Sequence, residues 1–131
     1  MLKPFLFVGV GGSGGDTLRY LHKDLSERLR RVGIAEMPSG WQFLQIDSRT
    51  SQEHHDDLPI PESPNYTYVG MVKRDVGYRT VVRLLENNDQ NRMALASWRP
   101  DPEKVKVPIE EGAGQYRAIG RVLTIARLQY V

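Results

Sequence analysis

The chain has 131 residues, of which 40% are hydrophobic and 26% charged, a composition typical of a soluble globular protein with its own core. It contains no cysteine, which excludes structural disulfides and cysteine-based zinc sites, and nothing points to secretion. The formal net charge is only +2, and the local cluster Arg28, Arg30 and Arg31 ends a predicted helix, where cations complement the helix dipole. No apolar stretch approaches the length of a membrane span. We therefore expect a cytoplasmic protein whose partners include neither nucleic acid nor membrane.

The N-terminal third of the sequence predicts a β–α–β unit. The apolar run Phe5–Val10 predicts a short, fully buried strand that stops at a cluster of glycines. Leucines three and four residues apart predict an amphipathic helix from about residue 16 to residue 32. The segment "WQFLQI" (residues 41–46) predicts a second strand, which ends at Asp47. Two such strands are parallel and joined by a right-handed crossover.

The remaining elements are shorter, and the last of them is the clearest. The pattern predicts, in order, a polar surface excursion over residues 48–65, a strand over 66–69, helices over 76–85 and 90–98, a connector over 100–108 and a helix over 115–130. One face of the last helix is formed by Ile119, Val122, Leu123, Ala126 and Tyr130. We expect one α/β domain over residues 1–131, with a three-layer, Rossmann-like parallel sheet.

The glycine cluster between the first strand and the first helix is the strongest functional signal. Five of the seven residues from position 9 to position 15 are glycine, and Gly9 to Gly14 follow the pattern G-x-G-x-x-G. Such glycines let the backbone approach a phosphate, and the first turn of the helix supplies N–H donors and partial positive charge. A structural tight turn without a ligand is the alternative. A P-loop is excluded, because Gly15 and Asp16 stand where Lys and Ser or Thr are needed.

Asp47 is the residue that keeps a dinucleotide (NAD or FAD) in consideration. An acidic residue at the end of the second strand can accept hydrogen bonds from a ribose. Asp47 lies 33 residues after Gly14, however, which is farther than the usual spacing of about 20. A cap on the following turn, "DSRTS", explains Asp47 equally well.

A second glycine cluster, Gly112-Ala113-Gly114-Gln115, is predicted to open the last helix. It would form a second anion site on the same physical argument. Two such sites favour a nucleoside triphosphate over a nicotinamide dinucleotide, which needs one site for its pyrophosphate.

Three segments resemble the tubulin/FtsZ superfamily, and in particular its bacterial tubulin-like branch: "GVGGSGG" after the first strand, "FLQIDS" at the end of the second, and "GAGQYRAIGR" near the last helix. The resemblance implies that the first glycine segment holds the α- and β-phosphates of GTP or GDP. It places the residues after the second strand beside the phosphates and Mg²⁺, and the G-A-G segment at the γ-phosphate. The implied nucleotide-binding residues are Gly11, Gly12, Ser13, Gly14, Gly15, Asp47, Ser48, Gly112, Ala113, Gly114 and Gln115.

The resemblance also implies head-to-tail self-association into filaments, with GTP hydrolysed at the junction between subunits. The family's G-G-G-T-G-T/S-G loop and its acidic loop are not found in these residues. We therefore expect the N-terminal, phosphate-binding half of a GTPase domain, with no catalytic residue of its own, so GTPase activity stays undecided. Two alternatives remain at this point: a dinucleotide-binding fragment of an oxidoreductase, and a non-catalytic assembly module with the same fold.

Overall fold

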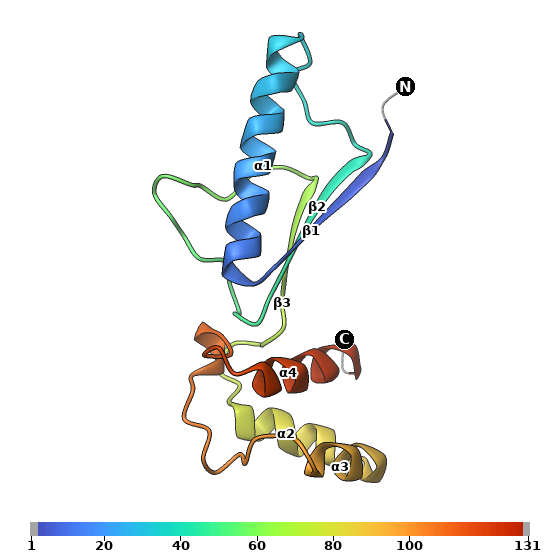
Figure 1. Ribbon diagram of the computed structural model, residues 1–131, viewed down its shortest axis with the longest axis vertical. Helices are drawn as coiled ribbons and strands as arrows, with labels where there is room; N and C mark the ends of the chain where they lie inside the picture. The colour runs from blue at the N-terminus through green and yellow to red at the C-terminus, as the bar shows by residue number, and fades with distance from the viewer. Residues whose placement is uncertain (1–2, 130–131) are drawn as a thin grey trace. The chain divides into compact units, whose positions relative to one another are not determined.

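The computed structural model describes residues 3–129, which form two compact units. The first unit comprises Met1–Asp47 and Gln52–Val69, and the second comprises Ser48–Ser51 and Gly70–Val131. The strands are β1 (Phe5–Val10), β2 (Trp41–Asp47) and β3 (Tyr66–Gly70), and the first unit also contains helix α1 (Gly11–Arg31). The second unit contains α2 (Tyr78–Glu86), α3 (Asp89–Ala96), the 3₁₀ helix η1 (Ile109–Glu111) and α4 (Arg117–Gln129) (Figure 1).

The sheet of the first unit confirms the predicted α/β fold with a Rossmann-like parallel sheet. Its strand order is β1-β2-β3, and β1 pairs in parallel with β2 in a register that places Phe5 opposite Trp41. Helix α1 packs on this sheet above the side chain of Phe43, which is 1% exposed. The ring centroids of Phe7 and Phe43 are 5.0 Å apart, and His22 of α1 meets Phe43 edge-on at 5.1 Å. Aromatic packing thus joins the two strands to the helix.

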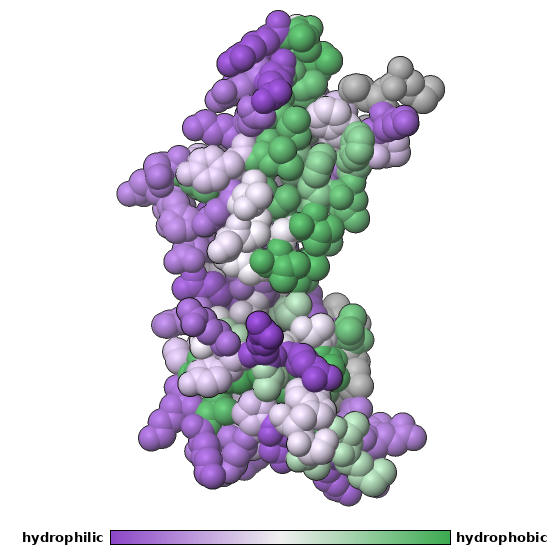
Figure 2. Space-filling view, in the orientation of Figure 1, coloured by the Kyte–Doolittle hydropathy of each residue, from purple (hydrophilic) through white to green (hydrophobic). Residues whose placement is uncertain are grey.

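Strand β1 is only half covered, so the prediction of a fully buried strand is wrong. Successive side chains of a strand point to opposite faces of the sheet. Phe7 and Gly9 face α1, whereas Leu6, Val8 and Val10 lie on the opposite face and are 64%, 50% and 70% exposed. Figure 2 shows this apolar surface in green beside the polar surface of the helix. A continuous apolar run does not reveal that α1 covers one face alone.

Helix α1 begins five residues earlier than predicted, at Gly11 instead of Asp16. Gly11 has a φ of +72°, so a single residue turns the chain from the strand into the helix. The glycine segment is therefore the first turn of the helix and not a loop before it. The other end agrees with the sequence: Arg28, Arg30 and Arg31 occupy the last turn, and Gly33 (φ +81°) donates its N–H to Arg30 O.

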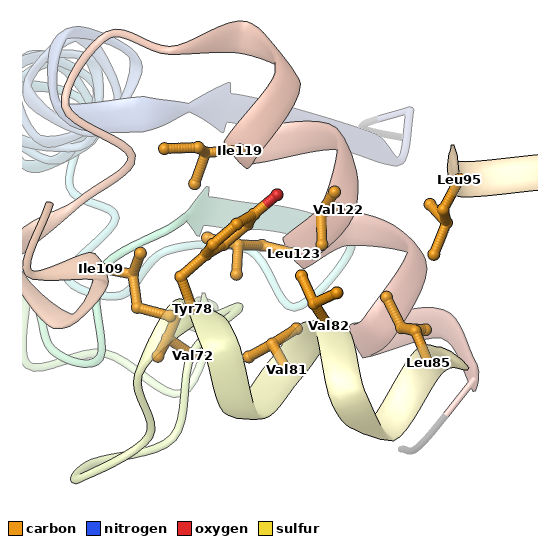
Figure 3. Packing of buried hydrophobic residues seen from close by; sticks show 10 residues of the cluster. All are labelled: Val72, Tyr78, Val81, Val82, Leu85, Leu95, Ile109, Ile119, Val122 and Leu123. Atoms are coloured by element: carbon orange, nitrogen blue, oxygen red, sulfur yellow. The ribbon is translucent and has the colours of Figure 1, made fainter. Parts of the chain in front are cut away.

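The core of the second unit forms between α2 and α4 (Figure 3). Tyr78, Val82 and Leu85 of α2 lie against Val122 and Leu123 of α4, and all five side chains are buried. The predicted apolar face of the last helix is thereby confirmed at Ile119, Val122 and Leu123, while Tyr130 lies outside the described residues. Within residues 3–129, no helix combines the length and apolar character that crossing a membrane requires.

Candidate functional site

Two glycines of the first segment are required because β1 and α1 touch backbone to backbone. A methyl group on Gly9 would lie 2.4 Å from the carbonyl oxygen of Gly14 and 2.8 Å from the side chain of Leu18. A methyl group on Gly14 would lie 2.9 Å from the carbonyl carbon of Gly9. Neither position has room for a side chain. Gly9 and Gly14 are therefore explained by packing within the first unit, without a ligand.

Gly15 is explained by a buried amide on the neighbouring strand. A methyl group on Gly15 would lie 2.0 Å from Nε2 of Gln45, which is 2% exposed in β2. Gln45 is held in place by Tyr66, whose hydroxyl donates to Gln45 Oε1 at 2.8 Å. Burial raises the pKa of Tyr66, against the opposing effect of Arg19, so the phenol stays protonated and keeps its donor. No local pattern points to this contact, because Gln45 looks like an ordinary polar residue of a strand.

Within the first glycine segment, Gly12 is the glycine that neither internal packing nor a positive φ explains. A methyl group there would meet no atom within 4 Å, and its φ is not in the left-handed region. The residue before the helix, Val10, makes no side-chain capping hydrogen bond, and the first turn contains no acidic residue. The first-turn amides of a helix have no partner inside the helix and carry partial positive charge. Gly12 and Ser13 thus lie on an open, uncapped helix N-terminus at which an anion can approach the backbone.

Two carboxylates come from the elements around this helix start, Asp16 from α1 and Asp47 from the end of β2, and their surroundings differ. Asp47 ends β2 and is 8% exposed. Asp16 Oδ1 lies 3.7 Å from Nε2 of His55, so this carboxylate faces the segment after β2. Among residues 3–129, no group of three or more His, Cys, Asp or Glu side chains converges as a metal site. A metal ion bound by the Asp47 carboxylate would therefore need its other ligands from a bound molecule or from water.

The second glycine cluster lies in a loop before the last helix, so the prediction that it opens that helix is wrong. Helix α4 begins at Arg117, and three residues before it have positive φ: Gly112 (+128°), Gly114 (+58°) and Gln115 (+65°). Residues with such φ values do not continue a right-handed helix. The helix-dipole argument therefore does not apply to Gly112, Ala113 and Gly114.

The backbone N–H groups of the G-A-G loop differ in whether they donate a hydrogen bond. Ala113 N–H donates to Ser48 Oγ at 3.1 Å, and Gly112 N–H donates to Ile109 O at 3.2 Å. Among the hydrogen bonds within the described part of the chain, none has the N–H of Gly114 or Gln115 as its donor. The structure thus brings together Ser48 and the G-A-G loop, which are 65 residues apart in the sequence.

The structure also reveals Arg49, which the sequence did not single out. Its Nε donates to the carbonyl oxygen of Glu111 at 2.8 Å, and the neighbouring Thr50 N–H donates to Glu110 O at 3.2 Å. An arginine in a polar, proline-rich stretch looks like a solvated surface residue. The interaction depends on a chain reversal over some sixty residues, which no local pattern encodes.

These features define an α/β protein with a parallel sheet whose first strand leads directly into a helix with an open, glycine-rich N-terminus. Residues 6–131 match the sequence profile of a family described as "Tubulin like". The match spans nearly the whole chain, and the chain belongs to the tubulin-like family. No curated protein and no solved structure gave a significant match.

Proposed function

We propose that this tubulin-like protein binds a guanine nucleotide, GTP or GDP, together with Mg²⁺. The observation that supports the proposal best is Gly12, an open glycine on the uncapped first turn of α1. Packing explains Gly9, Gly14 and Gly15, but not Gly12. A phosphate that approaches the amides of this turn accounts for the absence of a side chain there. Membership in the tubulin-like family favours GTP over other phosphate ligands.

The roles of the individual residues follow the order of the phosphates. Gly11, Gly12, Ser13, Gly14 and Gly15 form the first turn of α1 and its continuation, and they would bind the α- and β-phosphates. Gly112, Ala113, Gly114 and Gln115 would bind the γ-phosphate through their amides. The open amides of Gly114 and Gln115 fit this role. Ala113 N–H would have to exchange Ser48 Oγ for a phosphate oxygen, a replacement of one hydrogen bond by a stronger, charge-assisted one.

Asp47 and Ser48 fit a magnesium ion that is held mainly by the nucleotide. Mg²⁺ usually keeps several waters and takes one or two protein carboxylates in addition to phosphate oxygens. One buried carboxylate at the end of β2, followed by a hydroxyl, meets that requirement. The bound ion would neutralise charge on the phosphates. No residue of this chain is assigned a step in hydrolysis.

Head-to-tail self-association is the second part of the proposal, and it rests on family membership. If GTP drives assembly, light scattering and sedimentation of the protein will increase with GTP and Mg²⁺ and stay low with GDP. Assembly that is equal with GTP, with GDP and without nucleotide would contradict a nucleotide-dependent polymer. It would favour the alternative of an assembly module that has no nucleotide control.

A competition titration tests the nucleotide. The protein is titrated with a fluorescent GTP analogue in the presence of Mg²⁺, and GTP, ATP and NADH are added as competitors. We expect GTP and GDP to displace the probe, and ATP and NADH to displace it weakly. Tight binding of NADH with no competition by GTP would reject the proposal. It would instead support a dinucleotide site in which Asp47 contacts the ribose.

A further inference from the structure

Residues 48–51 form a short segment, here called the strap, that follows β2 and belongs to the second unit. On one side the strap meets the end of β3: a methyl group on Gly70 would lie 2.5 Å from Arg49 O and 2.9 Å from Thr50 O. On the other side it binds the loop before α4. The strap is therefore confined between two parts of the second unit, and its position is fixed from both sides.

Three consecutive strap residues bind η1 and the G-A-G segment that follows it. Thr50 N–H donates to Glu110 O at 3.2 Å, Arg49 Nε donates to Glu111 O at 2.8 Å, and Ser48 Oγ accepts from Ala113 N–H at 3.1 Å. Of these three hydrogen bonds, only that of Arg49 has a side-chain donor. A substitution at this position can remove it while the backbone of the strap keeps its own bond.

Arg49 contacts the loop directly before its first residue with a positive φ. Glu111 O, which accepts its bond, belongs to the peptide that leads into Gly112 (φ +128°). A methyl group on Gly112 would lie 3.7 Å from Arg49 Cγ, so the arginine stem runs along this peptide. Gln115, a residue with a side chain, is also held at a φ of +65°. Backbone in such conformations persists when its surroundings hold it in place.

We propose that Arg49 is a positioning residue that fixes the loop 112–115 and thereby sets the protein's preference for a nucleoside triphosphate over a diphosphate. The inference rests on the proposed function, which assigns the γ-phosphate to this loop. A loop that shifts loses its fit to the γ-phosphate, whereas the α- and β-phosphates lie at the first turn of α1. Removing the Arg49 bond therefore weakens triphosphate binding selectively.

Three substitutions at Arg49 separate the hydrogen bond from the charge. Arg49→Gln places an amide nitrogen the same number of bonds from Cα as Arg Nε, so it keeps a donor and loses the charge. Arg49→Met has similar length without a donor or a charge, and Arg49→Lys keeps the charge on a different stem. The quantity measured is the ratio of the dissociation constants of GDP and a slowly hydrolysed GTP analogue. We expect this ratio to fall about 3- to 10-fold in Arg49→Met, and to stay near the wild-type value in Arg49→Gln.

A ratio unchanged in Arg49→Met would overturn the inference. So would equal losses in Arg49→Gln and Arg49→Met with retention in Arg49→Lys, because the charge alone would then act on the phosphates. Gly70→Ala provides an independent perturbation, since its methyl group pushes the strap from the other side. It should lower the ratio as well. Gly120→Ala, at an open position of α4, is the matched control and should leave the ratio unchanged.

Amide hydrogen exchange without nucleotide separates failure of this inference from failure of the proposed function. Arg49→Met should speed exchange in the peptide that contains residues 110–116, and Arg49→Gln should restore its protection. If wild-type protein binds neither nucleotide while this exchange pattern holds, the proposed function fails and the strap remains a structural contact. If wild-type protein prefers the triphosphate and the exchange pattern is absent, the proposed function stands and the role of Arg49 is wrong.

Discussion

Replacing Gly12 by alanine separates a ligand-binding glycine from a structural one. Gly12 lies in the first turn of α1, where a methyl group meets no atom within 4 Å and the backbone has an ordinary φ. Alanine is a better helix former than glycine, so the change should stabilise the folded protein by about 0.5–1 kcal/mol. In an α-helix the Cα–Cβ bond tilts toward the N-terminus. The new methyl group therefore occupies the space in which we propose the phosphate binds.

The expected loss of affinity follows from the contact that the methyl group displaces. A hydrogen bond to a charged group contributes about 1.5–3 kcal/mol. Its loss corresponds to a roughly 10- to 150-fold rise in the dissociation constant of GTP. Gly12→Ala should thus raise stability and lower affinity, a combination that loss of folding does not produce.

The assay pairs thermal or denaturant unfolding with a GTP titration of the same preparations. Gly120→Ala is the matched control, since it makes the same chemical change at an open position in the first turn of α4. It should gain a similar stability and bind GTP as the wild type does. Binding of wild-type strength in Gly12→Ala would show that no phosphate contacts the backbone at this position. A loss of stability in that variant would equally show that Gly12 serves the fold.

Three further predictions concern the packing of the first unit. Gly15→Ala forces a methyl group against the buried amide of Gln45 and should lower the free energy of unfolding by about 1–3 kcal/mol, measured in urea. Arg19 is 2% exposed and donates to Glu53 O at 2.7 Å, so Arg19→Met should cost about 1–3 kcal/mol by the same measurement. Burial lowers the pKa of His22 below 6.5, so the unfolded chain binds its proton first, and stability should fall as the pH drops below about 6.5.

Each of these three predictions has its own control. For Gly15, the double variant Gly15→Ala, Gln45→Ala removes the clashing amide and should recover part of the lost stability, so a cycle without coupling would contradict the contact. For Arg19, unchanged protease sensitivity of residues 52–58 in Arg19→Met would contradict its role in holding that segment. For His22, the acid-side slope of stability should shrink in His22→Phe, and an equal slope would assign it to other groups.

The sequence predicted the order and type of the regular elements well, because their signals are local. Leucines that recur three and four residues apart predict α1, and the apolar runs that begin at Phe5 and Trp41 predict the two paired strands. Parallel pairing followed from the β–α–β order, which leaves little choice of topology. The start of α1 was misplaced because glycine is a poor helix former. A positive φ at Gly11 lets the helix begin inside the glycine segment.

The site was less predictable, because its decisive contacts join residues that are far apart in the chain. The approach of Gln45 to Gly15 depends on how α1 sits on β2. The bond from Arg49 to Glu111 spans 62 positions. The sequence predicts a helix start at the G-A-G loop, because glycine followed by an amphipathic pattern is typical of one. Positive φ at Gln115, a residue that rarely adopts it, gives no signal in the sequence.

We propose that both glycine segments bind one guanine nucleotide. Hydrogen exchange of the protein at saturating GTP and Mg²⁺ tests this binding, with GDP and nucleotide-free samples alongside. With GTP we expect slower exchange in the peptides that cover residues 9–16 and 110–116. With GDP we expect slower exchange in residues 9–16 and little change in residues 110–116. Protection confined to other parts of the chain, or no protection by either nucleotide, would show that the two segments do not bind one guanine nucleotide.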